Sequence, residues 1–363
     1  MKLTREGCRQ RQQRLAEVLD GAGLDGALIS RREHVNYFTG FLHHRYHAAA
    51  AYVSRTGAVT LVGDGVEART VAADEVIAYE AGRFFTMHSA QFEEVAATLA
   101  RAVPAGARVG ADLGGGIACI CALGGSEVKD LTREIYRLRK RKDPDEVDAL
   151  RDCIAVTEAM YRAAREAIAP GADEIDVFAH MRAEATRTAG QDLEHFGNDF
   201  RANDFGGLPR RRAMGVGELY ILDAGPSVDG YFADNCRTFA VDGSPTEAQM
   251  QVWQRIDGLF ADLEAAVRPG VKAAEVYALA HERLSGDGYE GLVHHLGHGM
   301  GLAPHEAPEL NPRYDAVFEV GDVFTMEPGL YSPALKAGMR LEENYLLTED
   351  GPERLTSFPR DLA

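Results

Sequence analysis

The chain has 363 residues, of which 45% are hydrophobic and 26% charged, and its formal net charge is −17. This length and apolar content are enough for two domains with sizeable cores. So large a negative charge argues against nucleic acid or an anionic membrane surface as the main partner.

The first 135 residues alternate between helical and strand-like patterns. An amphipathic helix is predicted over 4–22 and another helix near 90–102. The alternation is typical of an α/β domain, which we assign to residues 1–135. Gly114-Gly115-Gly116 lacks the G-x-G-x-x-G spacing of a dinucleotide site, so we interpret it as a loop. Strands are expected near 26–30, 49–54, 58–63, 75–79 and 107–111.

A basic run from Arg137 to Lys142 precedes a second long helical pattern. We interpret this run as a solvated junction between two domains. The helix is predicted over 143–168, and its first turn contains acidic residues, which suit the positive end of the helix dipole. The second domain is therefore predicted to span 143–363.

The second domain contains an internal repeat at an offset of 99 residues. The segment Ala167 to Gly171, ending in Pro-Gly, recurs as Ala266 to Gly270. At the same offset Val177 matches Val276, Ala179 matches Ala278 and His195 matches His294. Each copy is predicted to contain a helix, a Pro-Gly break, a helix and then a strand. These additional identities favour duplication over chance.

A β-hairpin is predicted between Glu218 and Val241, with turn-forming residues at its centre. A turn at Val228-Asp229 would place Asp223 opposite Asp234, whereas a turn at Asp229-Gly230 would make them diagonal neighbours. In either register both carboxylates lie on one face of the sheet. Two acids paired in this way destabilise a hairpin unless a cation lies between them.

Three more candidate metal ligands follow: His298 in HHLGHGMG, Glu327 in TMEPGLY and Glu342 in GMRLEEN. Glu327 ends a strand predicted over 321–327, and Glu342 lies within a strand predicted over 339–347. Four carboxylates and one imidazole at one point would bind a pair of divalent ions of the manganese, cobalt or zinc kind. The sequence therefore predicts a two-metal hydrolase, with Asp223 and Asp234 completing the set.

In these motifs the chain closely resembles the pita-bread metallopeptidases, which include aminopeptidase P, prolidase, methionine aminopeptidase and the metal-free creatinase. The resemblance covers residues 5 to about 355. It implies an α/β N-terminal creatinase-like domain followed by an α+β C-terminal pita-bread domain with a pseudo-two-fold repeat. It also implies that the enzyme hydrolyses the bond before proline in dipeptides or short peptides.

The resemblance also implies a role for each matching residue. Asp223 would chelate one ion, Asp234 and Glu342 would bridge the pair, and His298 and Glu327 would complete the second ion. Glu327 would also be the general base for the attacking water. Two cations would lower the pKa of this water towards neutrality. His305 matches a histidine that contacts the substrate, Tyr331 a tyrosine near the proton path, and Arg340 can hold a ligating carboxylate in place. His294 and His295 are expected to line or support the pocket.

The chain departs from the family at one position. Family peptidases carry a further histidine before the first ligand aspartate, where this chain has Arg210 after Pro209. His195 is the nearest upstream histidine that could replace it. The arginines at 210–212 could instead grip a substrate carboxylate, or they could form a solvated basic loop. This departure leaves proline specificity open.

Other features predict the setting of the enzyme. Five cysteines, an odd number without zinc spacing, indicate free thiols in a reducing cytoplasm. No apolar run resembles a signal peptide or a membrane span, so we expect a soluble cytoplasmic protein. The family resemblance implies a homodimer that acts on small peptides. The alternatives are a non-peptidase amide hydrolase of the same fold and a non-catalytic pita-bread binding module.

Overall fold

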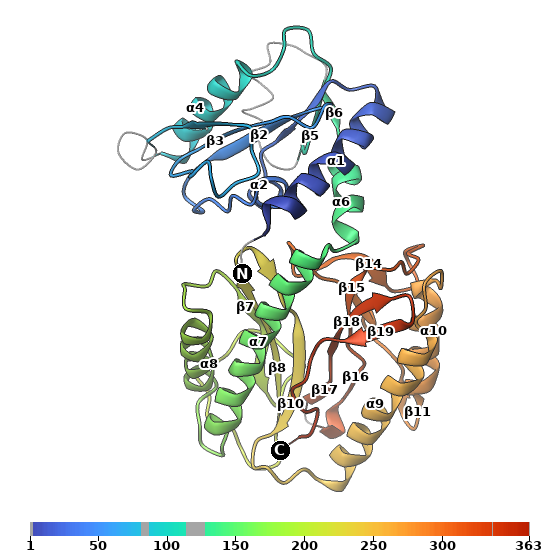
Figure 1. Ribbon diagram of the computed structural model, residues 1–363. Helices are drawn as coiled ribbons and strands as arrows, with labels where there is room; N and C mark the ends of the chain where they lie inside the picture. Colours follow the sequence, from blue (N-terminus) through green and yellow to red (C-terminus); the bar gives the residue numbers. More distant parts are fainter. Residues whose placement is uncertain (1–2, 81–86, 114–127, 336, 363) are drawn as a thin grey trace. The chain divides into compact units, whose positions relative to one another are not determined.

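The computed structural model describes residues 3–80, 87–113, 128–335 and 337–362. The chain divides into two compact units, one formed by 1–139 with 143–145 and the other by 140–142 with 146–363 (Figure 1). The predicted glycine loop at 114–116 and two of the cysteines, Cys119 and Cys121, lie outside the described residues. No described helix is long and apolar enough to cross a membrane.

The first unit is an α/β structure around one six-stranded sheet. Its helices are α1 (Arg5–Ala22), α2 (Arg32–Thr39), α4 (His88–Ala100) and α6 (Thr132–Lys140). Its strands are β1 (Gly26–Ile29), β2 (Ala49–Ser54), β3 (Val59–Gly63), β4 (Glu75–Ala78), β5 (Val109–Ala111) and β6 (Val128–Asp130). The strand order is β4-β3-β2-β1-β5-β6, and β1 to β3 are antiparallel.

The helices and strands predicted for this unit are present close to their predicted bounds, and α2, β6 and α6 are additional. Helix α4 packs on β2 and β3 through an apolar cluster that includes Leu28, Val95 and Leu99. Helix α2 has only eight residues, and its first turn begins with Arg32 and Glu33. Apolar periodicity is recognised over windows of about 11–18 residues, so an element as short as α2 is not recognised from sequence.

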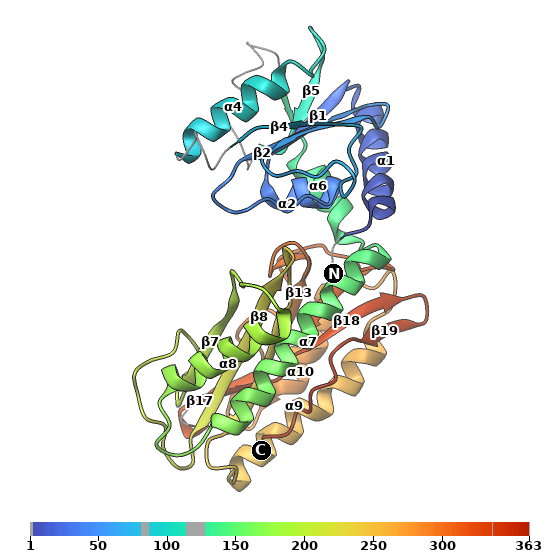
Figure 2. The ribbon, with the colours of Figure 1, turned by 60° about the vertical axis from the view of Figure 1, so that its left-hand side comes forward.

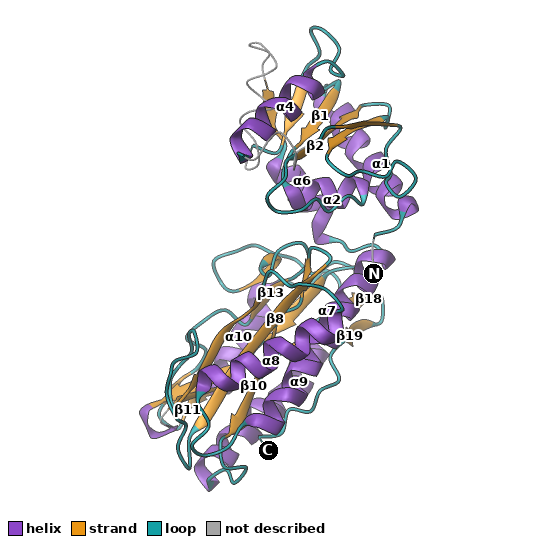
Figure 3. Cartoon of the chain, turned by 90° about the vertical axis from the view of Figure 1, so that its left-hand side faces the viewer, coloured by secondary structure: helices purple, strands orange, loops and turns teal. Residues whose placement is uncertain are grey.

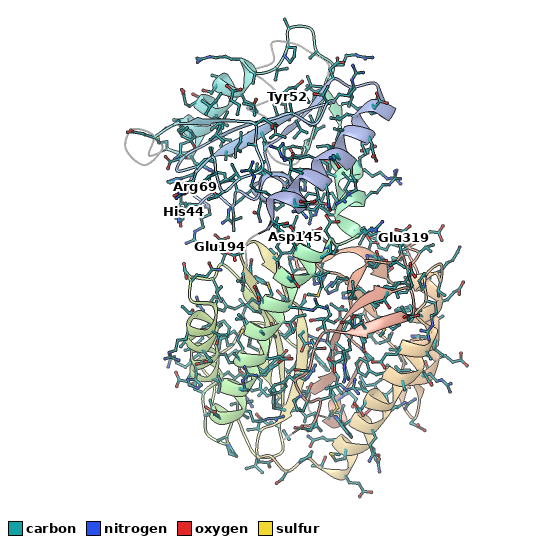
Figure 4. The ribbon with its side chains drawn as sticks, in the orientation of Figure 1. His44, Tyr52, Arg69, Asp145, Glu194 and Glu319 are labelled. Carbon is teal, nitrogen blue, oxygen red and sulfur yellow. The ribbon has the colours of Figure 1, made fainter. Side chains whose placement is uncertain are left out.

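The basic run at the junction, which is predicted to be solvated, is solvated only in part. Arg137 and Arg141 are exposed. In the first unit Arg139 is 2% exposed. In the second unit Lys140 donates to the exposed Glu319, which is labelled in Figure 4, at 2.8 Å. The Lys142 ammonium is buried and donates to the Glu306 carboxylate at 2.7 Å, and this pairing allows its burial, because a buried charge is tolerated only when it is paired.

The second unit consists of two halves with related element orders. The first half contains α7 (Pro144–Ala167), α8 (Glu174–Ala189), β7 (Phe196–Ala202), β8 (Leu219–Val228), β9 (Tyr231–Phe232) and β10 (Asn235–Ala240). The second half begins with α9 (Glu247–Ala266), α10 (Ala273–Leu284), β11 (Ser285–Gly286), β12 (Tyr289–Glu290), β13 (Gly297–Gly299) and β14 (Glu306–Leu310). It continues with β15 (Val323–Met326), β16 (Gly329–Ser332), a short 3-10 helix (Pro333–Leu335), β17 (Ala337–Arg340), β18 (Glu343–Thr348) and β19 (Gly351–Arg354).

The internal repeat is visible in the backbone hydrogen bonds. After the first helix of each half, Gly171 donates to Met214 and Gly270 donates to Phe318, each at 2.8 Å. The two glycines have φ angles of 90° and 88°, which glycine adopts without steric cost. The two donors are 99 residues apart and the two acceptors 104 apart. Because equivalent bonds recur with this small shift, the predicted duplication is a structural repeat as well as a sequence repeat.

The strands of the two halves meet at the centre of the unit. The first half forms the sheet β10-β8-β7, with β9 paired to β8, and the second half forms β14-β13-β15-β18-β19. Strand β17, which pairs with β16, also contacts β8 and β10. In Figures 2 and 3 helices α7 and α8 lie in front of the strands of this unit, so that they cover one face of them.

Candidate metal centre

The predicted hairpin of the first half has its turn at Asp229-Gly230, where φ angles of 50° and 83° suit a two-residue hairpin turn. This is the second of the two predicted registers, with Cys236 opposite Asp223. Asp234 lies in the break between β9 and β10. One carboxylate oxygen from each of Asp223, Asp234 and Glu342 lies within 4.8 Å of the others.

The second half contributes three side chains to the same place. His298 lies on β13, Glu327 directly follows β15, and Glu342 lies between β17 and β18. One ligand atom from each of these three lies within 4.8 Å of the others. Each of the five candidate ligands, which also include Asp223 and Asp234, is at most 7% exposed. The structure thus brings together five side chains that the sequence distributes over both halves.

Glu342 reaches this position from a break in the chain. A single strand is predicted over 339–347, but β17 ends at Arg340 and β18 begins at Glu343. The Glu342 backbone N–H instead donates to the Cys236 carbonyl at 3.0 Å, across to β10 of the other half. The predicted continuous strand was therefore wrong.

The carboxylates form a cluster that fits cations. Burial and the neighbouring carboxylates raise the pKa of Asp223 and of Glu342 well above their ordinary values. Asp223 Oδ1 and Glu342 Oε1 are buried, and no described residue donates a hydrogen bond to them. Hard oxygen donors beside an imidazole are ligands that divalent ions of the manganese, cobalt or zinc kind accept. These residues therefore fit a pair of divalent ions.

Arg340 connects one of these carboxylates to a chain of hydrogen bonds. Its Nη2 donates to Asp223 Oδ2 at 2.6 Å, and its Nη1 donates to the Tyr331 hydroxyl at 2.9 Å. Because a guanidinium only donates, Tyr331 must donate its own proton to His294 Nε2, 3.0 Å away. His294 Nδ1 is then protonated and donates to the His295 carbonyl oxygen at 2.6 Å. Burial lowers the pKa of His294, in keeping with this neutral form.

Two further histidines flank the carboxylates. His295 Nε2 donates to Glu327 Oε1 at 2.9 Å, and this bond raises the pKa of His295. Burial alone would raise the pKa of Glu327, but this bond and the nearby imidazoles lower it to about 2. The His305 ring stacks on that of His298, and His305 Nε2 lies 3.4 Å from Asp234 Oδ2.

A cavity of about 500 Å³ lies over the carboxylates. All the predicted site residues line it, and so do His294 and His295, as the sequence analysis expected. The sequence did not single out four other lining residues, which are Asn198, Asp199, Phe205 and Val293. For Asp199 a signal was present, because the repeat offset of 99 residues relates it to His298.

Comparison with known proteins identifies the family. Residues 148–349, a range that contains all five candidate ligands, match the model described as metallopeptidase family M24. Residues 11–141 match the creatinase/prolidase N-terminal domain. The chain belongs to metallopeptidase family M24. It is therefore a metallopeptidase, and the resemblance recognised from its motifs is confirmed.

The relatives of this M24 chain include two dipeptidases. An Xaa-Pro dipeptidase from Pyrococcus furiosus is 31% identical over 241 residues, which are 65% of this chain and 68% of that protein. An Xaa-Pro dipeptidase from Lactobacillus helveticus is 31% identical over 243 residues, 65% of each chain. The prolidase from Pyrococcus horikoshii OT3 superposes with a TM-score of 0.80 at 24% identity, over 98% of this chain and 100% of that one. The predicted fold is confirmed.

Of the arginines at 210–212 in this M24 chain, Arg211 is exposed, whereas Arg210 and Arg212 are partly buried in ion pairs. Arg210 donates to both oxygens of the Glu174 carboxylate, whose side chain is fully buried. Arg212 pairs with Glu218 at 2.5 Å. Neither Arg210 nor His195 is among the residues that line the cavity. The loop is held by ion pairs, and the alternative of a carboxylate grip therefore has no support from this geometry.

Proposed function

We propose that this metallopeptidase is a two-metal exopeptidase that hydrolyses the bond before proline in dipeptides or short peptides. The proposal is supported most strongly by the convergence of the five candidate ligands, some of whose buried oxygens accept no hydrogen bond from a described residue. These ligands are Asp223, Asp234, His298, Glu327 and Glu342. The relatives named as Xaa-Pro dipeptidases support the preference for proline. We also infer that residues 1–135 and 143–363 are the two domains, because the two family matches lie near these bounds.

The five side chains would hold the ions, with Asp223 on one, Asp234 and Glu342 shared, and His298 and Glu327 on the other. Two divalent ions held there would supply Lewis-acid activation of a water molecule and of the scissile carbonyl. Oxygen-rich coordination favours manganese, with cobalt or zinc as alternatives. The low exposure of the five ligands reduces their contact with water, which would strengthen their electrostatic interactions with developing charge.

Proton transfer would be the task of Glu327 and its partners. Its low pKa keeps Glu327 ionised at neutral pH, and the ionised carboxylate is the form that can bind an ion and accept the proton of the attacking water. His295 donates to the same carboxylate and holds it in orientation. His305 is half-exposed in the cavity wall, where its imidazole can donate to the substrate carbonyl. Tyr331 lies between Arg340 and His294 and would orient the guanidinium.

We also propose a cytoplasmic homodimer, as the sequence analysis predicted. The three described cysteines, Cys8, Cys153 and Cys236, are buried free thiols, which suits a reducing compartment. The dimer rests on the family resemblance, and sedimentation of the purified chain would test it.

Peptide turnover tests the proposed function directly. The chain reconstituted with Mn²⁺ should hydrolyse Ala-Pro and Gly-Pro and leave non-proline dipeptides largely intact. Comparison with Ala-Pro-Ala separates a dipeptidase from an aminopeptidase. Cleavage of non-peptide amides in place of all these peptides would favour the non-peptidase hydrolase. Failure to bind about two divalent ions per chain would favour the binding module.

A further inference from the structure

Asp199 faces the candidate ligands from the neighbouring strand. In the pairing of β7 with β8 it lies directly opposite Asp223, so the two carboxylates share one face of the sheet. Like charges directly opposite each other destabilise a strand pair. Arg340 relieves this repulsion, because its Nη2 lies 2.6 Å from Asp199 Oδ2 and 2.6 Å from Asp223 Oδ2. One guanidinium nitrogen therefore serves both carboxylates.

The other oxygen of Asp199 fastens a loop of the cavity wall. Asp199 Oδ1 accepts a hydrogen bond from the Gly207 backbone N–H at 2.6 Å. The preceding Gly206 has φ +146°, and a Cβ there would lie 2.6 Å from the Asp199 carboxylate. The loop is thus packed directly on this side chain. The next residue back, Phe205, lines the cavity with its ring 6.0 Å from that of Tyr331.

The repeat shows that this arrangement belongs to the architecture of the site. Asp199 and His298 are related by the offset of 99 residues. Asp199 lies on β7, the first strand after α8, and His298 lies on β13, which follows α10 after the short pair β11 and β12. The second half uses this position for a candidate ligand. The first half uses it for an acid bonded to the arginine that contacts Asp223.

We propose that Asp199 is a positioning residue of the metallopeptidase reaction, acting through Arg340. By accepting one of the two hydrogen bonds of Arg340 Nη2, Asp199 limits the pull of this nitrogen on Asp223 and leaves that carboxylate available to a cation. Without the charge of Asp199, Nη2 would bond to Asp223 alone and compete with the ion. The inference rests on the proposed function to the extent that Asp223 is a ligand.

Titration of Mn²⁺ alone into the metal-free chain tests the inference by calorimetry. Asp199→Asn keeps the shape of the side chain and an acceptor for Gly207, but removes the charge that Arg340 contacts. We expect it to weaken Mn²⁺ binding at least tenfold, and Asp199→Glu to restore the affinity to within threefold. Asp204→Asn is the matched control in the same loop, because Asp204 pairs with Arg201 and Arg210 outside the cavity lining. It should change the affinity less than twofold.

A second background separates positioning from a simple charge effect. In Arg340→Met, the further change Asp199→Asn should alter Mn²⁺ affinity less than twofold, because the residue through which Asp199 acts is gone. A tenfold effect that persists in this background would overturn the inference, since the charge of Asp199 would then act on the ion directly. Unchanged binding by Asp199→Asn, with a wild-type chain that binds Mn²⁺, would also overturn it. A wild-type chain that binds no Mn²⁺ would overturn the proposed function and this inference together.

Discussion

The imidazole rings of His298 and His305 stack with their centroids 3.7 Å apart and their planes 12° from parallel. His298 is buried among the candidate ligands, whereas the His305 side chain is 50% exposed. The inner ring therefore fixes the plane of the outer one, and the outer ring is the one that a substrate in the cavity can reach.

Replacement of His305 by Gln should impair catalysis and spare the metals. We expect kcat/KM for Ala-Pro to fall about 10²-fold, a typical loss for a group that assists proton or charge transfer. The metal content should stay at the wild-type value, because the five candidate ligands are untouched. Elemental analysis beside steady-state kinetics makes the comparison, and loss of one ion from the variant would instead place His305 in the coordination sphere.

Glu327→Gln should abolish turnover for a different reason. The amide keeps the volume but cannot take a proton, and it is a poorer ligand than the carboxylate that lies 3.4 Å from His298. We expect kcat to fall about 10³-fold or more, together with loss of metal from one site. Glu319→Gln is the matched control, since Glu319 is an exposed partner of Lys140. Substantial activity in Glu327→Gln would refute the role of this residue as base and ligand.

The bond between His295 and Glu327 should make the stability of the metal-free chain depend on pH. The raised pKa of His295 contributes stability that is complete below about pH 6.5 and is lost as pH rises through the folded pKa. Glu327, whose pKa is lowered to about 2, contributes stability that is complete above its ordinary value of 4.5 and is lost toward pH 2. Both contributions are therefore complete between about pH 4.5 and 6.5.

Melting curves of the EDTA-treated chain and of His295→Gln check this window. The wild type should exceed the variant by more at pH 5.5 than at pH 8.5. An equal difference at the two values would show that folding does not raise the pKa of His295 and that the bond carries no linked proton.

Divalent ions should stabilise the chain more strongly as pH rises. The raised pKa values of Asp223 and Glu342 mean that the metal-free fold retains protons that the unfolded chain has lost, so its stability falls as pH rises above about 4. An ion displaces these protons. A site at 100 times its Kd gains about 2.7 kcal/mol. The increase in Tm on adding Mn²⁺ should be larger at pH 7.5 than at pH 5, as measured by scanning calorimetry.

Arg210→Ala should destabilise the fold and leave dipeptide hydrolysis within about twofold of wild type. Its removal leaves the buried Glu174 carboxylate with fewer donors, which costs about 1–3 kcal/mol. Urea denaturation of the metal-loaded chain measures the loss. A rise in KM for Ala-Pro without any loss of stability would contradict the assigned role and restore the carboxylate grip.

The features that sequence predicted were those with local signals. Asp229 and Gly230 both tolerate the left-handed backbone of a tight hairpin turn, and this fixes the register that places Asp234 near Asp223. The two Pro-Gly breaks are also local signals, and they allowed the repeat to be predicted. The five candidate ligands stood in motifs whose flanking glycines and prolines made them recognisable.

The features that sequence did not predict depend on partners far along the chain. Lys142 looked solvated because its partner Glu306 lies 164 residues away. Arg210 looked free because Glu174 lies on the helix before it, and only the fold brings the two together. The break before Glu343 follows from the contact of Glu342 with the other half, which no local alternation of polar and apolar residues can encode.

The division of the candidate ligands between the halves has a consequence for motion. Asp223 and Asp234 belong to the half built on α7 and α8, whereas His298, Glu327 and Glu342 belong to the half built on α9 and α10. Bound ions would link one half to the other, so that partial unfolding of either half would release the ions that both halves coordinate. Amide exchange should therefore slow in α8 and α10 together on metal loading, even though neither helix contributes a single coordinating atom.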